Sequence, residues 1–130
     1  MIQGSEMILL VDDDPSFAGD LEALLKPYHD LTWASTSTEG LRLIRTRTPT
    51  RILLDLNMPH ALAALDEEEG LELVRRLTPE ERERVVVVTG ELSPANRERL
   101  RSLGAVRIYI KTEPLQKLRA MLQCDSLGEG

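Results

Sequence analysis

The sequence predicts an α/β fold: a flavodoxin-like, doubly wound, five-stranded parallel sheet with helices on both faces. Strand-like and helix-like segments alternate five times along the chain, which is the pattern of successive β-α units. Three strand-like segments are nearly continuous apolar runs, as expected when both faces of a strand are covered, whereas the second and fifth alternate. We therefore place the second and fifth strands at the edges. With right-handed crossovers, these edges are most simply met by the order 2-1-3-4-5 of flavodoxin-like sheets, a template that periodicity alone would not fix.

Each strand is recognised by its apolar residues and by the turn or helix signal that follows it. The first runs into three consecutive aspartates, and the fourth contains four consecutive valines before Thr89. The second alternates Leu31 and Trp33 with Thr32 and Ala34, which is typical of a half-covered strand. In chain order, the strands are expected over residues 7–11, 29–35, 51–56, 84–89 and 106–110.

Capping residues mark where the helices begin. Asp14-Pro15 and Ser93-Pro94 each place an N-cap residue before a proline at the first helical position. Thr36 and Glu39 have the spacing of a capping box. Apolar residues at helical spacing continue each segment. The helices are expected, in order, from Asp14-Pro15 to Lys26, from Thr36 to before Pro49, over 70–77, from Ser93-Pro94 to Leu103, and from Pro114 to Leu122.

Size and composition fit one domain in a reducing compartment. The chain has 130 residues and a formal net charge of -6, which argues against direct nucleic-acid binding. Cys124 is the only cysteine, so no internal disulfide can form and a cytoplasmic location is expected. No apolar run approaches the roughly 20 residues of a membrane span. We expect a disordered lead-in over 1–6, one domain over 7–124, and a tail or linker start over 125–130.

Polar side chains follow the strands at the edge where ligands bind in such sheets. Asp12 and Asp13 follow the first strand, Asp55 the third, Thr89 ends the fourth, and Lys111 follows the fifth. Mg²⁺ takes oxygen ligands and keeps several waters, so the adjacent carboxylates predict a magnesium site. An aspartate held there can act as a nucleophile toward a phosphoryl group. A lysine and a hydroxyl opposite it could stabilise the phosphoryl oxygens.

The motifs LLVDDDP, LLDLNMP, GLELV and VVVVTG, followed by the Ile-Lys pair after the fifth strand, occur in this order. With these spacings, residues 7–124 resemble the receiver domain of two-component response regulators. The roles that the resemblance implies are Mg²⁺ binding for Asp12, Asp13, Asp55 and the backbone carbonyl of Asn57, phosphoryl acceptance for Asp55, and contact with the phosphoryl group for Thr89 and Lys111.

The resemblance also implies the partners. A histidine kinase or a phosphotransfer protein would donate the phosphoryl group, and an output partner or domain that the sequence does not identify would receive the signal. Such a domain catalyses only its own phosphorylation and dephosphorylation and is otherwise not an enzyme. It would act as a signalling switch, with no partner role for a membrane.

Three departures from the family pattern leave an alternative open. The segment HALAALDEEE, residues 60–69, is an insertion after the third strand. The position usually held by an aromatic residue on the fifth strand is Ile108, with Tyr109 one place later on the opposite face, and we expect Ile108 to stay in the core. Thr112 replaces the usual proline after the lysine, so a cis bond is not expected there. The alternative is a receiver-like interaction module that works independently of phosphorylation.

Two charged runs are interpreted as solvated surface. The acidic run at 66–69 is expected to be a loop or the start of a helix rather than a second metal site. A basic strip is formed by Arg42, Arg45, Arg47 and Arg51.

Overall fold

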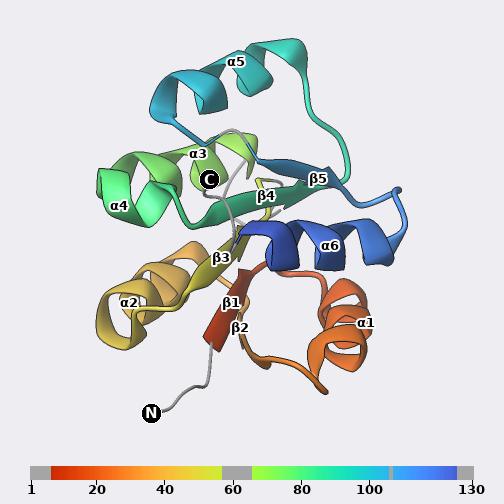
Figure 1. The fold of residues 1–130 in the computed structure, drawn as a ribbon. Helices are drawn as coiled ribbons and strands as arrows, with labels where there is room; N and C mark the ends of the chain where they lie inside the picture. The colour runs from red at the N-terminus through yellow and green to blue at the C-terminus, as the bar shows by residue number, and fades with distance from the viewer. Residues whose placement is uncertain (1–6, 57–65, 106, 126–130) are drawn as a thin grey trace.

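The computed structural model contains one parallel sheet with the strand order β2-β1-β3-β4-β5 and helices on both faces (Figure 1). It describes residues 7–56, 66–105 and 107–125. The predicted fold class, order and edge positions are confirmed. The strands are β1 (Met7–Val11), β2 (Asp30–Ala34), β3 (Arg51–Leu54), β4 (Val85–Thr89) and β5 (Ile108–Ile110).

The helices begin where the capping residues predicted. Asp14, Thr36 and Ser93 are N-caps whose side chains accept backbone N–H groups of the first turn. Only half of the predicted capping box at Thr36 is seen, because the Glu39 carboxylate pairs with Arg42 at 2.6 Å. The helices are α1 (Pro15–Leu25), α2 (Ser37–Arg47), α3 (Asp66–Arg76), α4 (Pro79–Arg82), α5 (Pro94–Leu103) and α6 (Leu115–Asp125).

Two helical features differ from the prediction. Helix α3 begins at Asp66 rather than at Gly70, so Gly70 lies inside the helix. The acidic run is the start of this helix, which was one of the two interpretations given for it. A glycine is required there because a Cβ atom would lie 2.6 Å from the Leu56 Cα atom. The short helix α4 was not predicted, although Thr78 and Glu81 form a complete capping box ahead of the fourth strand.

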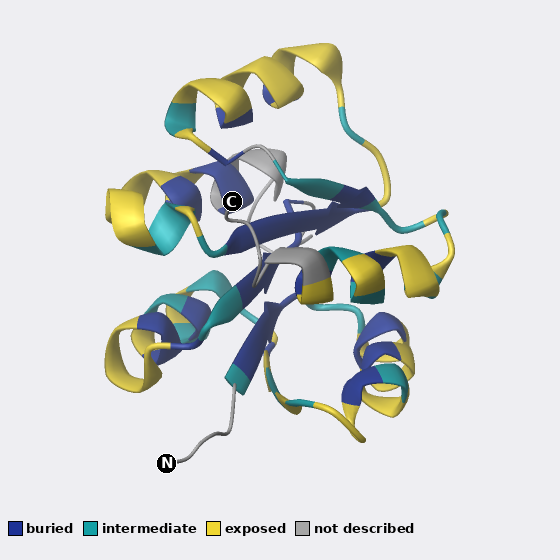
Figure 2. Ribbon diagram, viewed as in Figure 1, coloured by how far each residue is buried: buried dark blue, intermediate teal, exposed yellow. Residues whose placement is uncertain are grey.

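The sheet separates two apolar layers (Figure 2). On one face, α1 and α6 pack on the sheet through Leu21, Leu25 and Leu118. On the other face, α2, α3 and α5 pack through residues such as Ile44, Val74 and Leu100. Because both faces are covered, the central strands β1, β3 and β4 are buried almost throughout.

Strand β5 corrects one expectation. Side chains alternate as predicted, but Tyr109 is the fully buried residue, in the layer under α1 and α6. Ile108 is only partly buried and packs against the opposite layer. The expectation that Ile108 stays in the core is therefore met only in part, because Ile108 packs against one apolar layer without being fully buried. The sequence could not tell which face of the strand α6 covers.

Some expectations fall outside the described residues. These are the lead-in over 1–6, the tail beyond residue 125, Asn57, and the part of the insertion over 60–65. Within the described ranges, no helix is both long enough and apolar enough to span a bilayer.

Candidate functional site

The carboxyl ends of the parallel strands bring distant acidic residues together. Asp12 and Asp13 follow β1, and Asp55 follows β3, which pairs with β1. One carboxylate oxygen from each of these aspartates lies within 4.8 Å of those of the other two. Asp12 and Asp55 are buried, whereas Asp13 is half-buried. The structure therefore assembles the acidic cluster that the sequence indicated.

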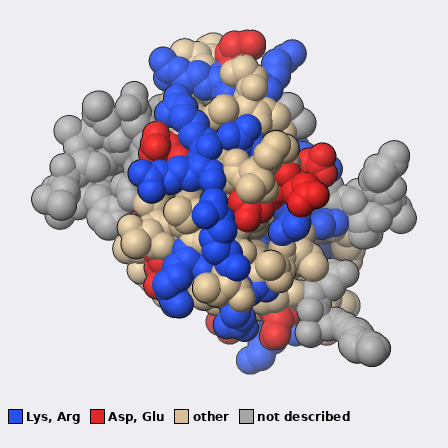
Figure 3. Space-filling model, turned by 90° about the vertical axis from the view of Figure 1, so that its left-hand side faces the viewer, with Lys and Arg blue, Asp and Glu red and all other residues tan. Residues whose placement is uncertain are grey.

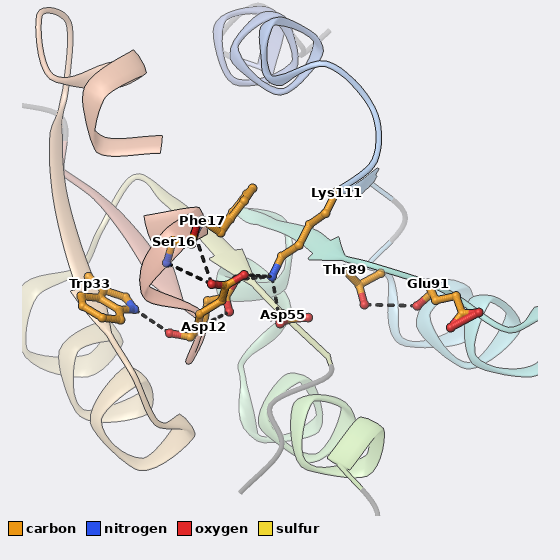
Figure 4. A network of polar contacts seen from close by, with 9 residues as sticks. Asp12, Ser16, Phe17, Trp33, Asp55, Thr89, Glu91 and Lys111 are labelled. Carbon is orange, nitrogen blue, oxygen red and sulfur yellow. Dashed lines mark hydrogen bonds and ion pairs between the residues drawn. The ribbon is translucent and has the colours of Figure 1, made fainter. Parts of the chain in front are cut away.

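Lys111 projects from the end of β5 into this cluster (Figure 4). Its Nζ atom lies 2.8 Å from Asp12 Oδ2, 3.3 Å from Asp55 Oδ2 and 3.9 Å from Asp14 Oδ2. Its side chain is 17% exposed. Burial on its own lowers the lysine pKa, but the hydrogen bonds and charges of Asp12 and Asp55 outweigh it, so the pKa of Lys111 is raised. A stable ammonium therefore joins the buried carboxylates.

Hydrogen bonds fix both the backbone and the side chain of Asp12. Its N–H donates to the Ala34 carbonyl at 3.0 Å, and its Oδ1 atom accepts the Asp14 N–H at 3.0 Å. Its backbone carbonyl accepts the indole N–H of Trp33 at 2.5 Å. This role of Trp33 could not be predicted, because a hydrogen bond to a backbone carbonyl leaves no pattern of residue types in the sequence.

Lys111 sits in a short turn that its neighbours hold closed. The Glu113 N–H donates to the Ile110 carbonyl at 2.8 Å, and the Glu113 carboxylate accepts the Ile110 N–H at 3.1 Å. The Tyr109 hydroxyl donates to the Glu113 carbonyl. No motif in the sequence indicates this role of Glu113. No peptide bond in the described ranges is cis, so the turn through Thr112 is made without one.

The remaining predicted residues have different placements. Thr89 ends β4 and is fully buried, and its hydroxyl donates to the Glu91 carbonyl at 3.2 Å (Figure 4). Asp14 caps α1, accepting the N–H groups of Ser16 and Phe17 at 3.0 and 3.3 Å, as the sequence predicted. Asn57 lies outside the described residues.

The donor set suits a hard divalent cation. Mg²⁺ prefers carboxylate oxygens, and the carboxylates of Asp12, Asp13 and Asp55 converge at one place. They also outnumber the single ammonium of Lys111, so the cluster keeps net negative charge. The residues present therefore fit a magnesium ion.

Arginines gather on a different part of the surface. Every arginine except Arg119 lies between positions 42 and 107, and a basic band runs down the face shown in Figure 3. Arg45 donates to the Arg76 carbonyl at 2.7 Å, and Arg82 donates to the Val74 carbonyl at 3.0 Å. Of the predicted basic strip, Arg45 thus bonds a carbonyl near the end of α3, where cations are favourable, and Arg82, outside the strip, does the same.

The chain matches the family model of the response regulator receiver domain over residues 8–123. It is 26% identical to the BeF3-activated N-terminal receiver domain of Klebsiella pneumoniae RstA, with a TM-score of 0.76 over 90% of this chain and 95% of that one. It is 25% identical to a CheY-like receiver domain protein from Methanospirillum hungatei JF-1, with a TM-score of 0.78 over 98% and 100% of the two chains. The receiver domain of a DNA-binding response regulator from Colwellia psychrerythraea 34H is 27% identical, with a TM-score of 0.75 over 95% and 98%. No curated protein matches the chain.

Proposed function

The chain belongs to the response regulator receiver domain family, and from that premise we propose that Asp55 accepts a phosphoryl group in a Mg²⁺-dependent reaction. The observation that carries the proposal is the position of Asp55. Its buried carboxylate shares Lys111 with Asp12 and lies within 4.8 Å of Asp13. The proposed acceptor Asp55, two neighbouring carboxylates and the Lys111 ammonium thus lie in one place.

The proposed step is a phosphoryl transfer from a phosphohistidine of a histidine kinase or phosphotransfer protein. A carboxylate oxygen of Asp55 forms a bond to phosphorus, and the phosphorus–nitrogen bond of the donor breaks, so that the imidazole leaves with the electron pair. Asp12, Asp13 and Asp55 would hold Mg²⁺, which supplies positive charge that offsets the charge of the phosphoryl oxygens.

Lys111 is suited to respond to this transfer. Its ammonium forms ion pairs with Asp12 and Asp55 before the reaction. Once one oxygen of Asp55 carries the phosphoryl group, Lys111 can pair with a phosphoryl oxygen. The Thr89 hydroxyl, at the end of the neighbouring strand β4, would provide a further hydrogen bond. The chain would then act as a signalling switch for an output partner or domain, and we place it in the cytoplasm, with no direct role in nucleic-acid or membrane binding.

The test is phosphorylation by acetyl phosphate with and without Mg²⁺, followed by intact mass. The wild type should gain the mass of one phosphoryl group only with Mg²⁺, and Asp55→Asn should gain none. Asp14→Asn is the matched control, because asparagine is also a good N-cap and Asp14 lies 3.9 Å from Lys111. Labelling of Asp55→Asn at the wild-type level would contradict the assignment.

A second candidate is an interaction module that works without phosphorylation. Two residues favour it: Ile108 at the usual aromatic position has no ring, and the Tyr109 ring is buried and hydrogen-bonded to the Glu113 carbonyl. The similar receiver domain of Klebsiella pneumoniae RstA is BeF3-activated, and beryllofluoride added to this chain separates the two candidates. A conformational change on its binding supports a switch, and binding of the output partner that is equal with and without it supports the module.

A further inference from the structure

The exposed edge of the acidic site contains an indole that the proposed function does not use. Trp33 lies near the end of the edge strand β2 and is 44% exposed. Although water could satisfy its N–H group, the indole donates to the Asp12 carbonyl at 2.5 Å (Figure 4). Because Trp33 is exposed, burial does not explain why its N–H group donates to a backbone carbonyl of the site.

The bond completes a set of restraints on Asp12. The Ala34 carbonyl holds the Asp12 N–H at 3.0 Å, and the Asp14 N–H holds Oδ1 at 3.0 Å. The indole N–H provides the third restraint by donating to the Asp12 carbonyl. With these three points fixed, Oδ2 faces Lys111 at 2.8 Å.

The carbonyl matters because it belongs to the peptide unit between Asp12 and Asp13. A peptide unit is planar, so fixing its carbonyl fixes the plane from which the chain continues to Asp13. The orientation of that plane sets the position of the Asp13 Cα atom, from which the Asp13 side chain projects. The indole therefore acts on the two adjacent carboxylates at once, and it does so from a neighbouring strand.

We propose that Trp33 is a positioning residue for the metal site: its N–H donor orients the Asp12-Asp13 pair toward Mg²⁺. This rests on the proposed function, since it assigns Trp33 a part in the same site. Removing a group that hydrogen-bonds to a metal ligand typically lowers metal affinity by about 10- to 100-fold. The Trp33 N–H donates to the backbone of a proposed metal-binding residue, so its effect is on metal binding.

The sequence makes a sharp test possible, because Trp33 is the only tryptophan. Global replacement of tryptophan by benzothienylalanine changes this one position, keeps the bicyclic ring and replaces the N–H by sulfur. Trp33→Phe is a second variant without the donor. Tyr28→Leu is the control, because Tyr28 is a more exposed aromatic residue that stacks with Arg119 rather than contacting Asp12.

The readout is the melting temperature of the intact chain across a range of Mg²⁺ concentrations, without any phosphodonor. By mass action, the melting temperature begins to rise near the dissociation constant. Both donor-free variants should need about tenfold more Mg²⁺ for this onset, whereas Tyr28→Leu should begin to rise at the wild-type concentration.

Two results overturn the inference in different ways. If the donor-free variants melt earlier by the same amount at every Mg²⁺ concentration, with an unchanged onset, the indole only stabilises the fold, and the proposed function stands. If the wild type itself does not respond to Mg²⁺, the metal site fails, and both the proposed function and the role of Trp33 fall with it.

Discussion

Replacing Lys111 by methionine tests whether one ammonium keeps the acidic site folded. Methionine keeps most of the length of the side chain and removes the ammonium, with its charge and its hydrogen bond to Asp55. The variant leaves Asp12 and Asp55 buried without the cation that now lies 2.8 and 3.3 Å from their Oδ2 atoms. We expect Lys111→Met to be less stable than the wild type in a chelator, and to recover part of the loss in Mg²⁺.

The structure sets the size of the effect. At these distances and an effective dielectric of about 20, each contact is worth roughly 5 to 6 kcal/mol before desolvation is subtracted. Breaking one member out of a buried ion pair costs about 3 to 5 kcal/mol net. Because the lysine side chain is still 17% exposed, the lower end applies. A loss of about 3 kcal/mol should lower the urea midpoint by roughly 1.5 M, for a slope of about 2 kcal/mol/M.

The assay is urea unfolding in chelator and in Mg²⁺, with Lys117→Met as the matched control. Lys117 pairs with Glu113 at 2.8 Å but is 53% exposed, so its loss should change stability by less than about 1 kcal/mol. The Mg²⁺-dependent gain should be larger for Lys111→Met than for the wild type, because no ammonium then competes for the carboxylates. A Lys111→Met midpoint in chelator that equals that of Lys117→Met would refute the reasoning.

Three further changes have defined outcomes. Asp13→Asn should raise the melting temperature in chelator, because it removes one of the clustered charges, and should delay the response to Mg²⁺; an earlier melt in chelator would contradict the repulsion. Gly70→Ala should destabilise the chain, since its Cβ atom would lie 2.6 Å from the Leu56 backbone, whereas Gly19→Ala, with open space at its Cβ position, should stabilise it by about 0.5–1 kcal/mol; equal urea midpoints would exclude the close contact. Burial raises the pKa of Tyr109, so the unfolded chain loses the phenol proton first and stability should fall as the pH rises above about 10; the fall should be smaller in Tyr109→Phe when urea midpoints are compared.

Much of the fold could be predicted because local signals and long-range pattern agreed. Asp14-Pro15 and Ser93-Pro94 mark helix starts through backbone chemistry that needs no tertiary context. Strands with and without alternation separate edge from centre. The order 2-1-3-4-5 also needed the template of flavodoxin-like sheets with right-handed crossovers, because periodicity alone leaves the order of the central strands open. The acidic cluster followed from that order, because Asp12, Asp13 and Asp55 occupy the same end of neighbouring strands.

The features that could not be predicted depend on backbone partners or on packing. Trp33 contributes to the site by donating to a carbonyl, and Glu113 contributes by accepting a backbone N–H. Any residue type offers those backbone groups, so no motif records the pairing. The start of α3 was misplaced for a related reason. Gly70 resembles a helix boundary, but its place in the helix is fixed by the approach of Leu56.

Strand β5 links the buried Tyr109 ring to Lys111 in the acidic site. Side chains two apart on a strand share a face, so Tyr109 and Lys111 project toward the same layer, where Phe17 lies 4.7 Å from the Lys111 Nζ atom. The Tyr109 ring is fully buried, and its hydroxyl is bonded to the Glu113 carbonyl, in the turn that carries Lys111. A rotation of this ring would expose apolar surface and open the turn together. Because the ring is hydrogen-bonded to the turn that carries Lys111, we expect a displacement of the ammonium to change the turn and the start of α6, where Lys117 pairs with Glu113.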